Sequence, residues 1–169
     1  MAWFIILYVI AIVLMHELGH YIAAKVQGLI VEGFKFSIKP VPHLYVSIID
    51  NRISMKQRII FLLGGNMLIM LMLVLFIISG IENKYLYYVL VCQTLLDINP
   101  FYSDYVVAIM SYIYRKEFKK EENNDSLINE LKEKYMFSPI WYIHLLLWGI
   151  MIILLLSPNF LNLYKISPL

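Results

Sequence analysis

Four long apolar stretches dominate this chain and limit what it can fold into. They cover about residues 2–27, 57–79, 85–114 and 139–156. A helix of about 20 mostly apolar residues crosses the hydrocarbon core of a bilayer. Hydrophobic residues make up 61% of the chain and charged residues 15%, a ratio of about four to one where soluble domains are nearer two to one. We therefore predict an all-α integral membrane protein of about four transmembrane helices, forming one domain over residues 1–169.

Charge and cysteine content exclude several other classes. The formal net charge is only +2, which predicts no binding of nucleic acid. The single cysteine excludes a disulfide scaffold, and the hydrophobic content excludes a disordered chain. The 13 tyrosines and 3 tryptophans are typical of membrane interface belts. Richness in Ile, Lys, Asn and Tyr is typical of an AT-rich bacterial genome, so we expect the bacterial cell membrane as the location and the lipid bilayer as a partner.

The basic residues predict the orientation of the chain. Of the 14 lysines and arginines, only Lys84 and Lys165 lie outside the first and third connections. The other 12 are Lys25, Lys35, Lys39, Arg52, Lys56, Arg58, Arg115, Lys116, Lys119, Lys120, Lys132 and Lys134. Because cytoplasmic loops carry an excess of basic residues, we expect both connections, including a charged loop at about 115–138, to be cytoplasmic. Both termini are then extracytoplasmic.

Two connections carry local structure signals. Phe34, Phe36 and Ile38 alternate with polar residues, and a second alternating run spans 44–49, so residues 31–49 are either a small β-hairpin or an ordinary loop. In the charged loop, a short helix from Asp125 or Ser126 to about 135 has Leu127, Leu131 and Tyr135 on one face.

The first apolar stretch contains the sequence His16-Glu17-Leu18-Gly19-His20, an H-E-x-x-H pattern. Histidines four apart lie on one helix face, so both can reach one metal ion while the adjacent carboxylate flanks it. From composition alone, a chain of this length would contain such a pattern on the order of 0.004 times. A carboxylate at mid-bilayer costs about 2.5 to 3.5 kcal/mol and is by default a sign of function. The pattern therefore predicts a Zn²⁺ site inside the membrane.

A catalytic zinc takes three protein ligands and keeps one position open. The third predicted helix is interrupted at Asn99-Pro100, and irregular backbone at membrane depth is tolerated only where it lines a cavity or is buried in protein. Asp97 and Asp104 flank this break, and from the residues alone either could be the third ligand. Asp97 is also suited to a capping or network role near the break, and Asn99 to capping the helix that follows.

These two segments resemble the site-2 protease family of intramembrane zinc metalloproteases. That family pairs H-E-x-x-H with a later Asn-Pro…Asp-Gly motif, here Asn-Pro-Phe-Tyr-Ser-Asp-Tyr at 99–105. The resemblance is to small bacterial members without PDZ or CBS domains, some of which process peptide precursors. It also gives residues 63–66, Leu-Gly-Gly-Asn, a loose likeness to a family segment whose small residues permit close helix packing.

The resemblance implies roles for individual residues. It assigns His16, His20 and Asp104 to zinc, Glu17 to general acid and base catalysis, and Asn99 to holding substrate or the oxyanion. Tyr105 stands where the family motif has glycine, and Asp97 stays the second candidate for the third ligand.

The two remaining histidines receive other interpretations. We expect His43 to be a solvated loop residue, although its place near the site leaves a functional role open. His144, in the last apolar stretch, is expected to hydrogen-bond a neighbouring helix.

We expect the chain to be a zinc-dependent metalloendopeptidase that hydrolyses a peptide bond of a membrane-associated protein or peptide precursor. One alternative is a non-catalytic membrane binding or immunity-type protein that retains the zinc motif. Another is a different intramembrane hydrolase, such as a prenyl-peptide processing enzyme. The sequence specifies neither the substrate nor the oligomeric state.

Overall fold

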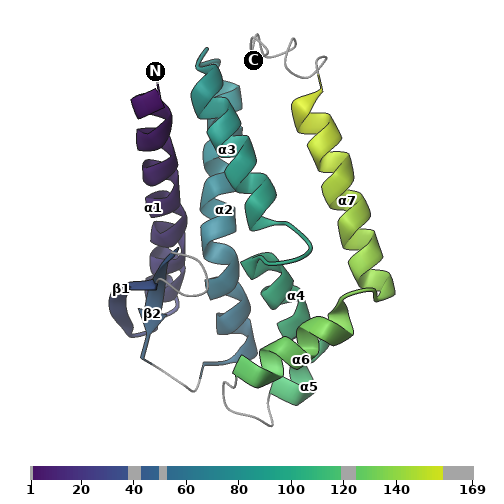
Figure 1. Ribbon diagram of the computed structural model, residues 1–169. Coiled ribbons are helices and arrows are strands. Elements are labelled where there is room, and N and C mark those ends of the chain that lie inside the picture. The colour runs from purple at the N-terminus through teal and green to yellow at the C-terminus, as the bar shows by residue number, and fades with distance from the viewer. Residues whose placement is uncertain (1, 38–42, 50–52, 119–124, 158–169) are drawn as a thin grey trace.

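A computed structural model describes residues 2–37, 43–49, 53–118 and 125–157. Helices and a small sheet follow one another along the chain (Figure 1). They are α1 (Ala2–Val26), β1 (Val31–Ser37), β2 (His43–Ile48), α2 (Met55–Ser79), α3 (Lys84–Asp97), α4 (Asp104–Ile113), α5 (Arg115–Phe118), α6 (Asp125–Tyr135) and α7 (Pro139–Leu156).

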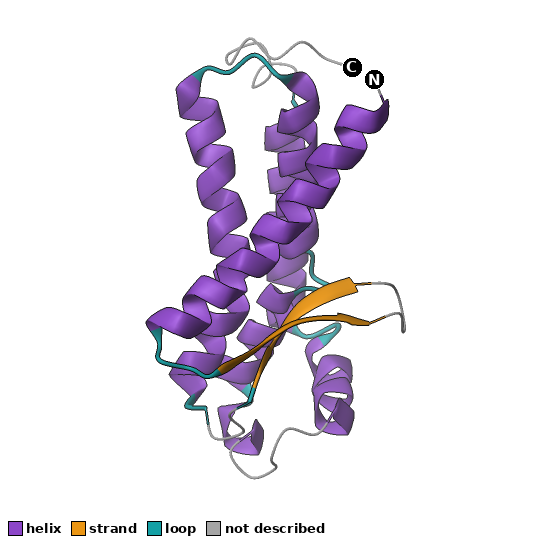
Figure 2. Ribbon diagram, turned by 90° about the vertical axis from the view of Figure 1, so that its left-hand side faces the viewer, coloured by secondary structure: helices purple, strands orange, loops and turns teal. Residues whose placement is uncertain are grey.

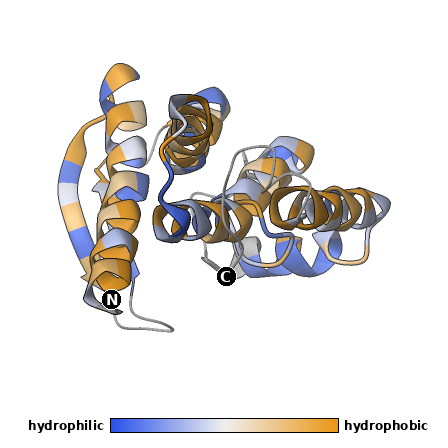
Figure 3. Ribbon diagram, turned by 90° about the horizontal axis from the view of Figure 1, so that it is seen from above, coloured by the Kyte–Doolittle hydropathy of each residue, from blue (hydrophilic) through white to orange (hydrophobic). Residues whose placement is uncertain are grey.

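Three helices in the described part of the chain are long and apolar enough to cross a membrane. These are α1 from Trp3 onward, α2 and α7. Hydrophobic colouring predominates along the helices in the view from above (Figure 3), and many large apolar side chains of α1, α2 and α7 are exposed. Such surfaces are stable only in contact with lipid or another apolar partner. The structure therefore indicates a membrane protein, as predicted.

The predicted third span, 85–114, is divided into two helices, and a single continuous crossing is not confirmed. The first, α3, ends at Asp97, and α4 begins at Asp104. Pro100 lacks a backbone donor and cannot continue the helix. Ser103 then starts α4 as its N-cap, since its side chain accepts a hydrogen bond from the Val106 amide. Each helix alone is shorter than the roughly 20 residues that a bilayer requires.

The helix α2 packs against α1, α3 and α4, and glycines bring its backbone into direct contact with α1. A Cβ atom added to Gly19 would lie 2.4 Å from the Gly64 carbonyl oxygen, and one added to Gly64 would lie 2.6 Å from the Gly19 oxygen. Small residues in 63–66 therefore do permit close helix packing, as expected.

The β-hairpin is confirmed. In the described residues, β1 and β2 form an antiparallel pair from Val31↔Ile48 to Ser37↔His43, with a shift of register between Val31 and Gly33. The strand β2 contacts α1, so the hairpin lies beside the second half of that helix (Figure 2). Ile38 and Lys39, which were predicted to continue the alternation, lie outside the described residues.

The short helix in the charged loop is also confirmed as α6. Its Leu131 and Tyr135 are buried in one cluster with Val106, Met110 and Trp141. The side chain of Leu127, predicted for the same face, lies outside the described part.

Basic residues gather at one end of the molecule. The hairpin, the start of α2, α5 and α6 lie at this end, and the start of α1, the α2–α3 turn and the end of α7 lie at the other (Figure 1). Most of the described basic residues are carried by elements at the hairpin end, whereas Lys84 begins α3 at the opposite end. Lys39, Arg52, Lys119, Lys120 and Lys165 lie outside the described residues.

Candidate metal centre

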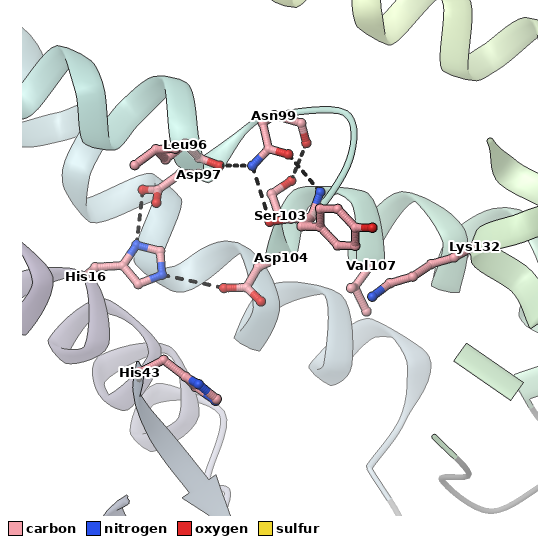
Figure 4. Close-up of a pocket in the computed structure, with 10 residues that line it drawn as sticks. His16, His43, Leu96, Asp97, Asn99, Ser103, Asp104, Val107 and Lys132 are labelled. Carbon is pink, nitrogen blue, oxygen red and sulfur yellow. Dashed lines mark hydrogen bonds and ion pairs between the residues drawn. The ribbon is translucent and has the colours of Figure 1, made fainter. Parts of the chain in front are cut away.

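Three side chains predicted as metal ligands meet between α1 and α4. His16 and His20 are buried on α1, and Asp104 is the first residue of α4. Asp104 Oδ2 lies 3.1 Å from His20 Nε2 and 3.5 Å from His16 Nε2. The two Nε2 atoms are 3.0 Å apart. Figure 4 shows the His16 ring between Asp104 and Asp97.

The other ring nitrogens are held by groups that only accept hydrogen bonds. His20 Nδ1 lies 2.7 Å from the Phe61 carbonyl oxygen, and His16 Nδ1 lies 3.0 Å from Asp97 Oδ2. A carbonyl and a carboxylate need a proton on the nitrogen that faces them. Each neutral ring therefore carries its proton on Nδ1 and directs the Nε2 lone pair inward, as in metal sites with an outer layer of hydrogen-bond partners.

The donor set fits a metal ion. Two lone pairs and one carboxylate oxygen converge, and these ligand atoms all lie within 4.8 Å of one another. A tetrahedral site with bonds of about 2.0 to 2.1 Å has ligand atoms about 3.3 Å apart, and the observed separations are 3.0, 3.1 and 3.5 Å. The His16, His20 and Asp104 cluster could thus hold a metal ion.

Asp97 occupies a different position from Asp104. Its Oδ2 faces His16 Nδ1, and its Oδ1 accepts a 2.6 Å hydrogen bond from Gln93. Its backbone oxygen accepts from the Asn66 side chain on α2 at 3.0 Å. The geometry therefore places Asp97 in the network behind the cluster, which was the role that its position beside the helix break suggested.

Gly65 makes room for the two imidazoles. A Cβ atom at this position would lie 2.6 Å from His16 Cε1 and 2.7 Å from Nε2 of both His16 and His20. The second glycine of the Gly64-Gly65 pair thus serves the cluster, whereas the first serves helix packing. In the sequence, the glycine pair before Asn66 indicates a close contact. The pattern does not indicate that the contact is with His16 and His20 on α1.

Glu17 is buried beside the cluster, with only 7% of its surface exposed. Its Oε2 has no hydrogen-bond partner among the described residues. The backbone of Val46 in β2 hydrogen-bonds the carboxylate. Glu17, His20 and Asp104 line a cavity of about 270 Å³ together with residues 43–46 of β2. A buried, incompletely paired carboxylate is costly and is therefore suited to accepting a proton from a group that enters this cavity.

A larger cavity of about 560 Å³ is also lined by Asp104. It is lined by His16, Asp97, Asn99 and Ser103 around the helix break, and by Lys132 of α6 (Figure 4). His43 borders both cavities and is exposed at the start of β2. It is thus exposed, as predicted, but it belongs to a strand paired with Ser37 and not to a loop, and it also lines the space around the cluster.

Asn99 organises the turn between α3 and α4. Its Oδ1 accepts hydrogen bonds from the amides of Phe101 (3.0 Å) and Tyr102 (2.7 Å), and its Nδ2 donates to the Leu96 and Tyr102 carbonyls. The cap of α4 is Ser103, so the alternative that Asn99 caps this helix is wrong. Asn99 does line the larger cavity, and its contact with substrate stays a prediction.

Comparisons of the chain with protein-family models, curated proteins and solved structures returned no match.

Proposed function

We propose that this chain is an intramembrane zinc metalloprotease that hydrolyses a peptide bond of a membrane-associated protein or peptide precursor. One observation carries the proposal: the Nε2 atoms of His16 and His20 and a carboxylate oxygen of Asp104 converge beside a buried Glu17, on a helix apolar enough to cross a bilayer. The resemblance of both motifs to site-2 proteases supports the same assignment.

Zinc is the metal that we propose, because two imidazoles and a carboxylate form a three-ligand catalytic set that leaves one position open. His16, His20 and Asp104 would hold it. The chemistry that a bound Zn²⁺ supplies is Lewis acidity, which polarises a carbonyl group and brings the pKa of water near 7.

The protein's own residues would move the proton. As a water oxygen bonds to the scissile carbonyl carbon, the Glu17 carboxylate takes one water proton. It then delivers this proton to the amide nitrogen as the C–N bond breaks, which yields a carboxylic acid and an amine. The unpaired Oε2 of Glu17 supports this role. Asp97 would keep the His16 ring in the tautomer that presents Nε2 to the metal.

The substrate would have to be extended at the cleavage site, because a helix hides its carbonyls in backbone hydrogen bonds. Residues 44–46 of β2 line the same cavity as Glu17, and β2 pairs with β1 along one edge. We propose that a substrate segment adds beside β2 in this cavity, since strand addition holds a peptide through its main chain.

We also propose how the helices cross the membrane. Two short helices, α3 and α4, together would form a fourth crossing, broken where its polar backbone lines the larger cavity. The basic end of the molecule, with the hairpin, α5 and α6, would face the cytoplasm of a bacterial cell. Both termini would be extracytoplasmic and the cluster would lie within the bilayer.

The alternative is a membrane protein that binds zinc without catalysing a reaction. Cleavage of a peptide substrate distinguishes the metalloprotease from this alternative. Purified protein in liposomes is mixed with lipid-anchored peptides of random sequence, and new peptide ends are detected by mass spectrometry. We expect cleavage that a chelator stops, that Zn²⁺ restores, and that His20→Ala abolishes. Stoichiometric zinc without any cleavage would favour the binding protein, and cleavage that survives the chelator would exclude the metalloprotease.

A further inference from the structure

The helix break between α3 and α4 leaves backbone carbonyls without helical partners, and side chains bind most of them. On the side of α7, Trp148 Nε1 donates to Leu95 O at 2.9 Å, and Trp141 Nε1 donates to Pro100 O at 3.1 Å. His144 Nε2 lies 2.9 Å from Ile98 O. These three donors are spaced three and four residues apart and therefore lie on one face of α7.

His144 is fixed at both ring nitrogens. Because Ile98 O only accepts hydrogen bonds, His144 Nε2 carries the proton, and Nδ1 accepts from the Tyr135 hydroxyl at 2.8 Å. Burial raises the pKa of Tyr135 to about 12, so this hydroxyl keeps its proton at neutral pH. The prediction that His144 bonds a neighbouring helix is confirmed, and its partners are α6 and the broken segment.

The remaining surface of α7 is mostly exposed. Within the described residues of this helix, only Trp141 and His144 are buried. The opposite end of α7 is joined to α3 by one more polar contact, a 2.7 Å hydrogen bond from the Tyr87 hydroxyl to Leu155 O. These hydrogen bonds add to ring contacts that the same face of α7 makes with the broken segment, where Phe101 lies against both Trp141 and Trp148.

Two of these carbonyls, those of Ile98 and Pro100, lie in the segment that separates the two carboxylates of the metal centre. The third, that of Leu95, lies in the last turn of α3, two residues before Asp97. Asp97 precedes this segment and faces His16 Nδ1, and Asp104 follows it and faces Nε2 of both histidines. Residues 98–103 form no helix. Their conformation therefore depends on the side chains that bind their backbone groups.

We propose that Trp141, His144 and Trp148 are positioning residues, through which α7 sets the placement of Asp97 and Asp104 around the histidines. None of the three belongs to the ligand cluster. The inference rests on the metal centre of the proposed function and is independent of proteolysis. It gives α7 a role in the site beyond crossing the membrane.

The test uses the whole protein in nanodiscs and two readouts. The first is hydrogen exchange, without metal, of peptides that cover residues 95–107. We expect exchange to accelerate in Trp141→Phe, Trp148→Phe and the double variant. The acceleration should be roughly threefold for each hydrogen bond removed, the average effect of such bonds between membrane helices. Trp3→Phe is the matched control, because Trp3 is 78% exposed at the far end of α1, and it should leave this exchange unchanged.

The second readout is the affinity and visible spectrum of bound Co²⁺. We expect His144→Leu to lower the affinity about tenfold, the lower end of the effect of removing a direct partner of a metal ligand, and to shift the spectrum. His144→Gln retains a donor for Ile98 O and should restore most of the affinity. The circular dichroism of the helices identifies any variant that fails to fold. If His144→Leu or the double tryptophan variant does not fold, the milder His144→Gln and single tryptophan variants supply the affinity and exchange measurements. Unchanged exchange in the folded tryptophan variants would overturn the proposal, as would equal Co²⁺ affinity in folded His144→Leu and the parent.

Discussion

Asp97 Oδ2 lies 3.0 Å from Nδ1 of His16, the ring nitrogen that faces away from the ligand cluster. The two carboxylates that flank the helix break therefore serve opposite sides of one imidazole. Asp104 lies beside Nε2 of both histidines, and Asp97 hydrogen-bonds Nδ1 of His16. This division leads to different expectations for two chemically matched substitutions.

Asp104→Asn should lower metal affinity by more than 100-fold, because it removes the only carboxylate among the three ligand atoms. Asp97→Asn should lower it only about 10- to 100-fold, the usual effect of an outer partner. Metal competition with a chromophoric chelator measures both. A larger loss in Asp97→Asn than in Asp104→Asn would reverse the assignment of the third ligand.

Gly65→Ala should impair the metal centre more than the fold. The new methyl group would lie 2.6 to 2.7 Å from atoms of both imidazoles, so the rings must move from their positions. We expect at least a tenfold loss of metal affinity, comparable with the loss of an outer partner. Gly149→Ala is the control, because nothing lies within 4 Å of a Cβ atom there. Equal metal affinity in the two variants would show that the rings tolerate the contact.

Gly19→Ala should mainly destabilise the fold, although Gly19 lies within the H-E-x-x-H motif. Its methyl group would meet the Gly64 backbone at 2.4 Å, and backbone cannot yield as a side chain can. Overpacking of this kind costs about 1 to 3 kcal/mol. Thermal unfolding in detergent measures the loss, again against Gly149→Ala. A melting temperature equal to that of the control would contradict the direct contact of α1 with α2.

His43→Ala should leave metal affinity within about twofold of the parent, because the ligand cluster consists of His16, His20 and Asp104. His43 borders both cavities, so a change in cleavage rate with metal affinity preserved would indicate contact with substrate. Isothermal titration with Zn²⁺ is the measurement. A loss of affinity as large as that in His20→Ala would make His43 a ligand.

The sequence was most informative where the pattern is local. The spacing of His16 and His20 fixes them on one helix face whatever surrounds them. Alternation at 31–49 indicated a hairpin as one of two alternatives, and the hairpin is the one that forms. The third ligand was different. Asp97 and Asp104 both flank the break, and only the path of residues 98–103 determines which carboxylate faces the inward nitrogens.

Contacts between helices were the least predictable part. Tryptophans in an apolar chain are typical of interface belts, yet Trp141 is 5% exposed and binds a backbone carbonyl. The apolar pattern of α7 conceals this role, because hydropathy does not report where an indole N–H points. The fit of Gly65 against two rings of α1 likewise depends on the register between helices.

Metalloprotease activity is tested by one paired measurement on Glu17→Gln: the zinc content of the purified protein and the cleavage of lipid-anchored peptides in liposomes. Glutamine preserves the shape of the side chain but cannot take the water proton, and Glu17 lies outside the ligand cluster. We expect one equivalent of zinc, as in the parent, with cleavage reduced by at least 100-fold, the contribution typical of general acid–base catalysis. Cleavage at the parent rate by zinc-loaded Glu17→Gln would contradict the role of Glu17 in proton transfer.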